Sequence, residues 1–416
     1  MDDSSPRVLV VTQAFPPEKG GNASRMGDLC RHMADNVELT VVAPPTCFPP
    51  GEFEWSWKRA TKKRREGHDL IRLWSWQPRT VDPSFVERML YYIIFAFHAL
   101  VWAFLRRDEF DVVLTSSPPI FTGLVAFPLS ITGSAKWVLD IRDLWIDVSS
   151  DLGFISGDGI ATRLSRRYQE QALKRADLVT ITTPGTEARM REHYSFETAV
   201  QVIPNGVDTQ YFEPQDEPQT ADLIYTGNIG YGQDLETCIR ALPLLENSDV
   251  TFTLVGDGDL RPELTALAER LGVTDRVEFT GLVPRDEIPR LLNGATIGVA
   301  PLKARESLSY AVPTKVYEYL ACKLPVLALG NGEIERVVEA SEGGVIPDGS
   351  PQSVADAIDE LLDDERRRRR MATRGRQFVV SNYDRQAIAA ELFDAISKLV
   401  EPANWPVSER RARSRS

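Results

Sequence analysis

A lysine and a glutamate stand three positions apart in the stretch PTKVYEYLACKLPV, residues 313–326. On a helix, this spacing places Lys315 and Glu318 on one face, with Tyr317 packing beneath them. The free N–H groups of the first turn, around Thr314, attract phosphate together with the lysine. A carboxylate one turn further in accepts hydrogen bonds from the two hydroxyls of a ribose. The stretch is a candidate nucleotide grip, and the alternative is an ordinary amphipathic helix with a solvated lysine and glutamate.

Glycines mark other places where a ligand can approach the backbone. Gly20 and Gly21 lie between the first predicted strand and the first predicted helix, although a purely structural turn would also explain them. Gly227, Gly256 and Gly281 each follow a predicted strand in the second half of the chain. If these strand ends face one crevice, they predict a nucleotide site at the interface of two domains.

A third group of polar residues, in VLDIRDLW, stands at the end of another predicted strand. Ligands of open α/β sheets bind beyond the carboxyl ends of the strands, so Asp140, Arg142 and Asp143 are candidates for the acceptor side. The two aspartates are also candidate catalytic groups. A helix cap explains such an aspartate equally well, and no histidine stands nearby in sequence to complete a metal site.

These residues need two domains to position them. Apolar runs typical of buried parallel strands occur at 7–12, 37–43, 70–74, 111–115, 135–140, 177–181 and 199–203, with helices between most of them. A linker rich in Pro, Gly, Asn and Asp follows at 204–221, and a second alternation of strands and helices fills 222–384. The pattern predicts an α/β fold with two doubly wound domains, at 1–203 and 222–384.

The composition narrows the class of protein. The 416-residue chain has 43% hydrophobic residues and a formal net charge of −12, which argues against general nucleic-acid binding. Its four cysteines have no paired spacing, so neither a zinc site nor a disulfide framework is indicated. The acidic N-terminus runs into a strand almost at once, and we expect no secretory signal. A reducing, cytoplasmic environment fits best.

One predicted helix, within 85–107, is apolar all the way round. Its segment MLYYIIFAFHALVWAFL would reach about 25 Å, short of the roughly 30 Å hydrocarbon core of a bilayer. Flanking arginines and aromatic residues suit a segment that dips into the headgroup boundary, and the upstream basic stretch WSWKRATKKRREGH adds attraction to anionic lipid. The alternative is a helix buried against the sheet, with the basic stretch as a solvated loop.

Six motifs in order resemble glycosyltransferase family 4, retaining enzymes with the two-domain GT-B fold. They are IPNGVD, YTGNIGYGQDLETCIRAL, LVGDGDLRPEL, EFTGLVPRDEIPRLL, APL and PTKVYEYLACKLPV. PPEKGGNASRMGDLCRHMAD and LDIRDLW resemble the branch that builds surface polysaccharides and glycolipids. The resemblance implies that the last helix, 385–400, crosses back to the first domain. The tail at 401–416 is basic and polar, and we expect it to be disordered.

The resemblance also implies roles for residues. Glu318 matches the second glutamate of the family's paired motif and should hold the ribose. The other donor-side positions are Gly227 and Asn228 at the diphosphate, Gly256 in the next loop, Gly281, Leu282 and Val283 around the base, and Gly20 and Gly21 between donor and acceptor. The DGD at 257–259 imitates a metal-binding aspartate pair, but it occupies the family's glycine-rich turn, so we expect no metal and no cofactor.

Several positions depart from the family pattern. The first glutamate of the pair falls on Tyr310, and the usual arginine and lysine of the diphosphate loop fall on Asn228 and Gln233. The histidine often found near the reacting carbon is absent from LDIRDLW. These losses make Lys315 the expected replacement cation, with Lys303 and Arg305 as alternatives.

The implied function is retaining transfer of a sugar from a nucleotide-diphosphate donor, a UDP-sugar first, to a lipid-linked or saccharide acceptor. We expect this at the cytoplasmic face of the membrane, with the region 85–107 at its surface. Two alternatives stay open: a nucleotide-sugar epimerase of GT-B architecture, and a non-catalytic nucleotide-sugar-binding subunit. The sequence does not identify the transferred sugar, the catalytic base or the oligomeric state.

Overall fold

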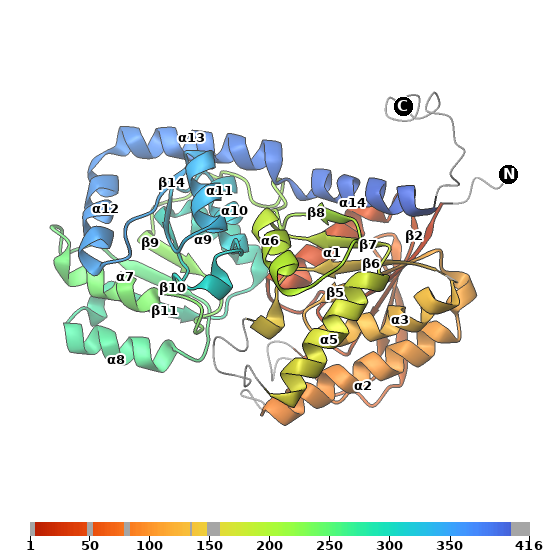
Figure 1. Cartoon of the computed structure of the whole chain (residues 1–416). Helices are drawn as coiled ribbons and strands as arrows, with labels where there is room; N and C mark the ends of the chain where they lie inside the picture. The colour runs from red at the N-terminus through yellow and green to blue at the C-terminus, as the bar shows by residue number, and fades with distance from the viewer. Residues whose placement is uncertain (1–4, 48–52, 79–83, 134, 148–158, 401–416) are drawn as a thin grey trace, which may run out of the picture.

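The computed structural model describes residues 5–47, 53–78, 84–133, 135–147 and 159–400. In this part of the chain, two lobes stand side by side, each built on one sheet with helices on both faces (Figure 1). The predicted alternation of strands and helices and the doubly wound α/β class are confirmed. The tail at 401–416, for which we expect disorder, lies outside the described residues.

The first sheet has the strand order β3-β4-β2-β1-β5-β6-β7-β8. Neighbouring strands are parallel except for β3 and β4, which pair antiparallel. The strands are β1 Arg7–Val11, β2 Glu38–Ala43, β3 Ala60–Arg65, β4 His68–Leu73, β5 Val112–Ser117, β6 Lys136–Ile141, β7 Leu178–Ile181 and β8 Val200–Val202. The order of the strands reverses between β1 and β5, and such switch points are where doubly wound sheets bind ligands.

Strand β3 is missing from the strands predicted above. Its sequence, ATKKRR, is dominated by cations and has no apolar alternation. It lies at the edge of the sheet, where lysine and arginine are common because they discourage pairing with another chain. The basic stretch upstream of the apolar helix is therefore partly an edge strand and not only a loop.

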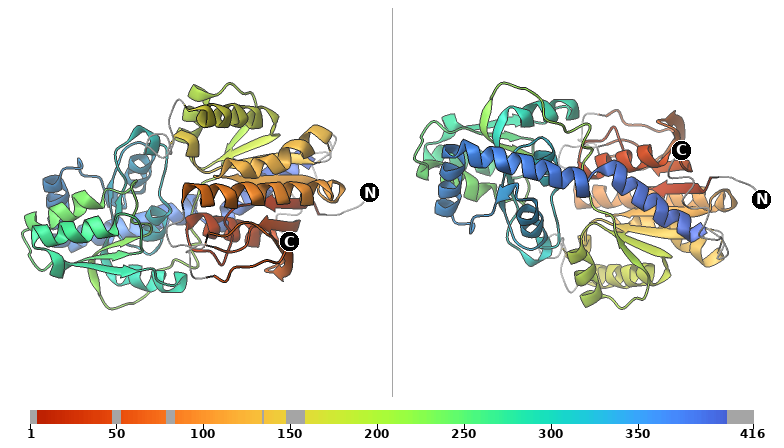
Figure 2. Two further views of the ribbon diagram at one scale, coloured as in Figure 1. Left: turned by 90° about the horizontal axis from the view of Figure 1, so that it is seen from below. Right: turned by 90° about the horizontal axis from the view of Figure 1, so that it is seen from above.

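Helices cover both faces of the first sheet. They are α1 Gly21–Met33, α2 Phe85–Phe104, α3 Gly123–Thr132, α5 Ile160–Arg175 and α6 Pro184–His193. Figures 1 and 2 show α2, α3 and α5 together on one side of the lobe, and the apolar side chains of these three helices share one core cluster with the strands. Helix α1 lies on the other face with the C-terminal helix of the chain.

Helix α2 is the predicted apolar helix, and it begins with a capping box between Ser84 and Glu87. Val86–Phe104 is long and apolar enough to cross a membrane by length and composition. However, Phe95 and Ala99 on one face are fully buried against the sheet, whereas Phe97 on the opposite face is 67% exposed. The helix is therefore a packed part of the first lobe that keeps an apolar surface toward the outside.

The second sheet has the order β11-β10-β9-β12-β13-β14 and is parallel throughout, with its own switch point between β9 and β12. Its strands are β9 Ala221–Thr226, β10 Phe252–Val255, β11 Val277–Gly281, β12 Ala295–Pro301, β13 Val326–Leu329 and β14 Gly344–Val345. Its helices are α7 Leu235–Ala241, α8 Arg261–Leu271, α9 Ile288–Asn293, α10 Thr314–Ala321, α11 Glu333–Ser341 and α12 Pro351–Asp363.

Short 3-10 helices occur at Arg107–Glu109, Ile120–Thr122, Leu242–Leu244, Thr274–Arg276, Arg285–Glu287 and Glu306–Leu308. The segment between β8 and β9, 203–220, covers the linker predicted at 204–221 except for its last residue, Ala221, which begins β9.

Two consecutive helices cross from one lobe to the other. Helix α13, Glu365–Asn382, packs on the second lobe, and α14, Arg385–Val400, lies along the first (Figure 2). Ile388, Leu392 and Ile396 of α14 join the core cluster formed by α1 and strands β1 and β2. The last helix of the chain thus ties the second lobe to the first sheet.

Candidate active site

The carboxyl ends of the two sheets meet where the lobes touch. Gly21, at the start of α1 in the first lobe, abuts Thr314, at the start of α10 in the second lobe. A Cβ atom built on Gly21 would lie 3.2 Å from the Thr314 Oγ1 atom, so a side chain there would press on the donor helix. The structure thus places the predicted glycine loop directly beside the predicted nucleotide grip.

Lys315 is buried at this interface, with 8% of its surface exposed. Its ammonium group donates a 3.0 Å hydrogen bond to Gln233 Oε1 and lies 3.6 Å from the centroid of the Tyr225 ring. A Cβ atom on Gly227 would lie 3.3 Å from Lys315 Nζ. Burial lowers the pKa of Lys315 to about 7, because the charged form loses its hydration. A lysine held in this way is poised to regain its charge beside an anion.

Three glycine loops stack next to Lys315. Gly227, Gly256 and Gly281 all have positive φ, which glycine adopts without strain. Gly256 N–H donates to Gly281 O at 2.9 Å, and a Cβ atom on Gly256 would overlap the carbonyl of Gly227. Asn228 follows in the same loop, and its carbonyl accepts from the Tyr225 hydroxyl at 2.5 Å. Only glycine at position 256 allows the loops after β9 and β10 to come this close.

Glu318 is half-buried one turn into α10, on the same side as Lys315. Its carboxylate forms no hydrogen bond or ion pair with the residues that the structure describes. Burial raises its pKa, opposed by the nearby charges of Arg385, Arg285 and Lys315. An accessible carboxylate with its acceptor sites open is what two ribose hydroxyls require.

The predicted base loop follows β11. Leu282 is 44% exposed and Val283 packs partly into the core of the second lobe. Arg261 lies 5.9 Å from the Phe279 ring and 3.6 Å from the position of a Cβ atom on Gly281. An exposed leucine beside a glycine turn offers an apolar surface on which a nucleobase can lie.

The structure gives Asp140 a different role from the catalytic one expected above. It is 2% exposed and accepts hydrogen bonds from Arg25 Nη1 and Nη2 at 2.9 and 3.1 Å. The hydroxyls of Ser116 and Thr180 donate two more, at 3.0 and 2.9 Å. With its carboxylate saturated and its pKa lowered by Arg25, Asp140 is a structural ion pair that joins α1 to the sheet. It is not available to move a proton.

Asp143 differs from its neighbour Asp140 because it is exposed. The surrounding protein desolvates its carboxylate and raises its pKa to about 6, and Arg142 opposes the shift. A carboxylate that titrates near neutral pH suits general acid or base chemistry. Asp143 therefore stays a candidate catalytic group, and Arg142, the next residue inward, stays a candidate on the acceptor side.

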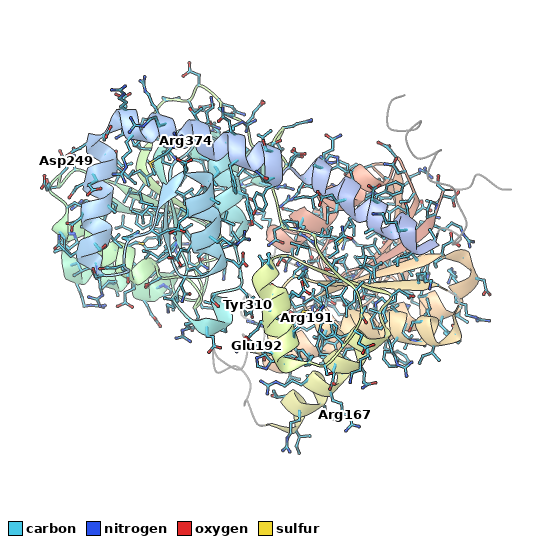
Figure 3. All side chains as sticks on the ribbon, turned by 45° about the horizontal axis from the view of Figure 1, so that its top comes forward. Arg167, Arg191, Glu192, Asp249, Tyr310 and Arg374 are labelled. Carbon is cyan, nitrogen blue, oxygen red and sulfur yellow. The ribbon has the colours of Figure 1, made fainter. Side chains whose placement is uncertain are left out.

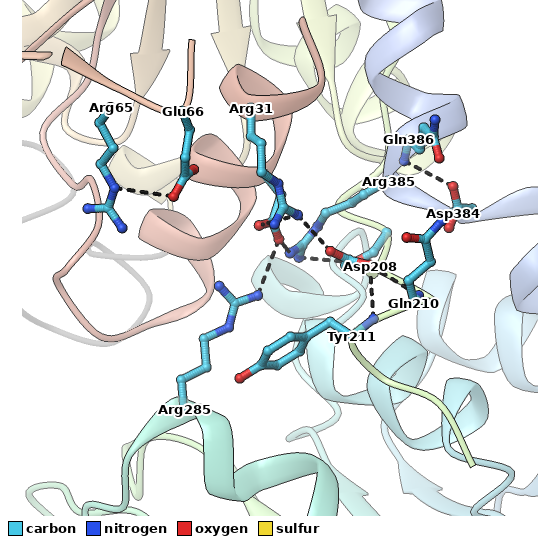
Figure 4. Close-up of polar contacts among 12 residues, drawn as sticks. Arg31, Arg65, Glu66, Asp208, Gln210, Tyr211, Arg285, Asp384, Arg385 and Gln386 are labelled. Carbon is cyan, nitrogen blue, oxygen red and sulfur yellow. Dashed lines mark hydrogen bonds and ion pairs between the residues drawn. The ribbon is translucent and has the colours of Figure 1, made fainter. Parts of the chain in front are cut away.

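A buried carboxylate that was not predicted organises the contact between the lobes. Asp28 of α1 pairs with Arg285 of the second lobe at 3.2 Å, with Arg31 at 3.2 Å and with Arg385, and Figure 4 labels these three arginines. Arg31 also reaches Asp208 at 2.6 Å, and the Arg285 guanidinium lies 5.0 Å from the Tyr211 ring. These ion pairs connect α1 to the linker through Asp208 and to α14 through Arg385, close to Glu318.

A second contact between the lobes lies at α6. The Thr183 hydroxyl donates to the Tyr310 carbonyl at 2.5 Å, and Gly185 N–H donates to Glu333 Oε1 at 2.7 Å. Tyr310 is 3% exposed and its ring belongs to the core cluster of the first lobe. Figure 3 shows it at the junction of the lobes, near Arg191 and Glu192 of α6. The residue at the first glutamate position of the family motif thus packs between the lobes.

In the DGD turn, the carboxylate of Asp257 already has partners within the protein. Asp257 Oδ1 accepts from Gly258 N–H at 2.9 Å, and its other oxygen pairs with Arg261 at 3.4 Å. Across the described ranges, no three His, Cys, Asp or Glu side chains gather as a ligand set.

Comparisons with known proteins agree with this arrangement. The profile of a family described as "Glycosyl transferase 4-like domain" matches residues 20–206, and that of "Glycosyl transferases group 1" matches residues 220–364. The chain is 27% identical to a GDP-mannose-dependent alpha-(1-6)-phosphatidylinositol monomannoside mannosyltransferase of Mycolicibacterium smegmatis, over 94% of this chain and 98% of the relative. It is 24% identical to WcaI of Escherichia coli, a putative colanic acid biosynthesis glycosyl transferase, over 76% and 81%.

Solved structures with the same fold include sucrose-phosphate synthase from Thermosynechococcus elongatus, with a TM-score of 0.77, 20% identity and coverage of 94% of this chain and 99% of that one. HepE of Anabaena in complex with UDP gives a TM-score of 0.67 at 18% identity, covering 94% of this chain and 100% of that one. These likenesses confirm the predicted GT-B architecture. Together, the two family profiles match most of the chain, and it belongs to glycosyltransferase family 4, whose members transfer a sugar from a nucleotide-sugar donor.

Proposed function

We propose that this glycosyltransferase carries a sugar to a lipid-linked acceptor at the cytoplasmic surface of a membrane, with retention of configuration and without a metal ion. The observation that carries the metal-independent part is the buried ammonium of Lys315 beside the Gly227 loop. Breaking a sugar–phosphate bond places negative charge on the departing diphosphate, and a fixed cation together with helix N–H groups stabilises that charge.

The acceptor hydroxyl needs to lose a proton during transfer. Asp143 is exposed at the carboxyl edge of the first sheet, and the departing phosphate is itself a base. We propose that one of these two groups takes the proton. Contacts between the lobes at Asp28 and at Thr183 hold the two halves of the site together, which would exclude water and favour transfer over hydrolysis.

An exposed apolar surface on the first lobe supports a place at the membrane. The surface, which we name the apolar face, consists of side chains of α2, α3 and α5 that are 39 to 73% exposed: Val86, Leu90, Ile93, Phe97, Val101, Phe104, Leu124, Ile131, Ile160 and Leu164. Large exposed apolar patches on soluble proteins mark interaction sites, and we infer that these residues on three neighbouring helices form such a patch.

Cations at the end of α2 fit a lipid surface. The guanidinium of Arg106 lies 4.6 Å from the Trp102 ring, and that of Arg107 lies 5.2 Å from the Phe104 ring. Arginines that lie along aromatic rings at the end of an apolar helix suit the headgroup region of a bilayer, where anionic lipid attracts them. We propose that the apolar face dips into the headgroup boundary of the bilayer.

The relatives do not identify the nucleobase of the sugar donor. From the family resemblance we expect a UDP-sugar first, whereas the mycobacterial relative is named for GDP-mannose. That relative also acts on a phosphatidylinositol monomannoside, which supports a lipid-linked acceptor here. UDP- and GDP-sugars are therefore the donors to compare first.

Vesicle flotation with the purified protein tests the membrane part. Val101 on α2 and Val380 on α13 are exposed to 42 and 43%, so V101E and V380E are a matched pair. We expect V101E to reduce binding to anionic vesicles strongly and V380E to leave it unchanged. Equal binding by both variants would contradict the proposal. A transfer assay with vesicle-borne lipid extract, run with and without EDTA, tests the metal-independent part, since loss of activity in EDTA would refute it.

A further inference from the structure

Arg142 is a buried arginine with most of its hydrogen-bonding capacity unused. It is 8% exposed, and its Nη2 group donates a 2.8 Å hydrogen bond to the carbonyl of Pro118. Among the residues that the structure describes, its Nε and Nη1 groups have no partner, and it forms no ion pair. A buried charged group whose N–H donors lack hydrogen-bond acceptors costs free energy. Such a group therefore usually binds a ligand or a partner.

Gln13 is a second buried side chain without partners in the same region. It is 7% exposed, and both its amide nitrogen and its amide oxygen lack a hydrogen-bond partner within the described ranges. It lies two residues beyond the end of β1. A buried amide with both ends open can donate to one hydroxyl of a ligand and accept from another.

The sheet topology brings these two residues to the same edge of the first sheet. Gln13 follows β1, Arg142 follows β6, and β5 runs between these strands, so the two residues flank the end of β5 at about 10 Å. The bond from Arg142 to the carbonyl of Pro118, which follows β5, places its Nη2 group on the side of β6 that faces β5 and β1. This is the switch point of the first sheet, where doubly wound folds take their ligands.

We propose that Arg142 and Gln13 form a subsite for the acceptor, in which Arg142 binds a phosphate ester and Gln13 binds hydroxyls of the sugar or polyol attached to it. The inference rests on the proposed function, because it names the chemistry of the acceptor at that site. A phosphate ester offers several acceptor oxygens and a full charge to the unused N–H groups of Arg142. It also fits an acceptor that is linked to a lipid through phosphate.

Among the described residues, no direct ion pair neutralises the charge of Arg142. Arg25 is already paired with Asp140, and Asp143 makes no ion pair with Arg142 in the described part of the chain. Burial lowers the pKa of Arg142 to about 10, and the nearby carboxylates of Asp140 and Asp143 oppose the shift. A bound phosphate would neutralise this cation and complete its hydrogen bonds.

The test measures phosphate binding while the donor site is filled. Purified wild-type protein, saturated with the nucleoside diphosphate that it binds, is titrated with inorganic phosphate or with acetate at matched ionic strength, and the melting temperature is followed. We expect phosphate to raise the melting temperature and acetate to have a much smaller effect. In R142Q, phosphate affinity should fall at least about tenfold, R142K should recover part of it, and R167Q should match the wild type.

R167Q is the matched control because Arg167 is exposed on α5 and points away from the lobe junction (Figure 3). Equal phosphate effects in R142Q and wild type, equal effects of acetate and phosphate, or no effect of phosphate on the wild type would each overturn the subsite. If R142Q fails to fold, crystals of the wild type soaked in phosphate decide, since density within hydrogen-bonding distance of Arg142 Nη1 is required. Loss of the nucleotide-induced stabilisation itself would instead refute the proposed function.

Discussion

Lys315 Nζ donates its hydrogen bond to Gln233 Oε1, so the lysine of α10 reaches the position at which the family usually places a cation. We propose that Lys315 supplies from α10 the charge that the family resemblance leads us to expect in the diphosphate loop. This hydrogen bond supports our proposal that a chain without the usual arginine and lysine can still bind the diphosphate group of the donor. It also suggests an exchange of the two side chains as an experiment.

Lys315→Gln should reduce kcat by about 10² to 10³, the usual effect of removing one fixed donor to a developing charge. The double variant K315Q/Q233K should recover a large part of this loss, because it returns a cation to the loop from position 233. Steady-state transfer kinetics provide the measurement. Lys323→Gln, an exposed lysine just after α10, is the control. A double variant no better than K315Q would show that the cation acts only from α10.

Donor binding should be linked to proton uptake. The pKa of Lys315 is lowered to about 7 in the empty site, and a bound diphosphate raises it by favouring the charged form. Affinity for a nucleotide sugar should therefore be constant below pH 7 and fall as the pH rises above it, by up to about tenfold per unit. Calorimetry near pH 8 in buffers of different ionisation enthalpy measures the protons taken up. An uptake of zero there would contradict the shifted pKa.

Glu318→Gln should remove the discrimination between a ribose and a deoxyribose. The wild type should bind the nucleoside diphosphate about tenfold or more tightly than its 2′-deoxy analogue, since hydrogen bonds to a charged group contribute about 1.5–3 kcal/mol. In E318Q this ratio should approach one. Titration calorimetry with the two nucleotides measures it, and an unchanged ratio in E318Q would place the ribose elsewhere.

Of the three arginines that pair with Asp28, Arg385 and Arg285 should differ in their importance for stability. Arg385 is 1% exposed, so Asp28→Ala leaves a buried cation without its partner and should lower the free energy of unfolding by about 3–5 kcal/mol. The side chain of Arg285 is 39% exposed, and Arg285→Gln should cost less than about 1 kcal/mol. Chemical denaturation of both variants gives the comparison. Similar losses in the two would show that the lobe contact, and not the α14 contact, dominates.

The sequence predicted most of the fold because its signals are local. Buried parallel strands are continuous apolar runs, and Lys315 and Glu318 are placed by the register of one short helix. Strand β3 was missed because an edge strand of lysines and arginines has no apolar pattern. Its place is set by antiparallel pairing with β4, which the segment itself does not reveal.

The parts of the site that were missed depend on distant partners. Asp140 is a plausible catalytic group in sequence, and only its contact with Arg25, 115 residues away, shows that its carboxylate is occupied. Asp28 has no signal of its own, because its partners come from α1, from the loop after β11 and from α14. Contacts between the lobes arise from tertiary packing, which a reading of one segment at a time does not contain.

The central claim is that α10 holds a nucleotide-diphosphate sugar between the lobes. The most direct measurement is a thermal-shift screen of wild type and E318Q against UDP-, GDP- and ADP-sugars, because a ligand of the folded state raises the melting temperature. We predict that sugars linked to one of the three nucleotides stabilise the wild type and that E318Q loses most of this stabilisation. No stabilisation by any of these donors, or equal stabilisation of both proteins, would contradict the claim.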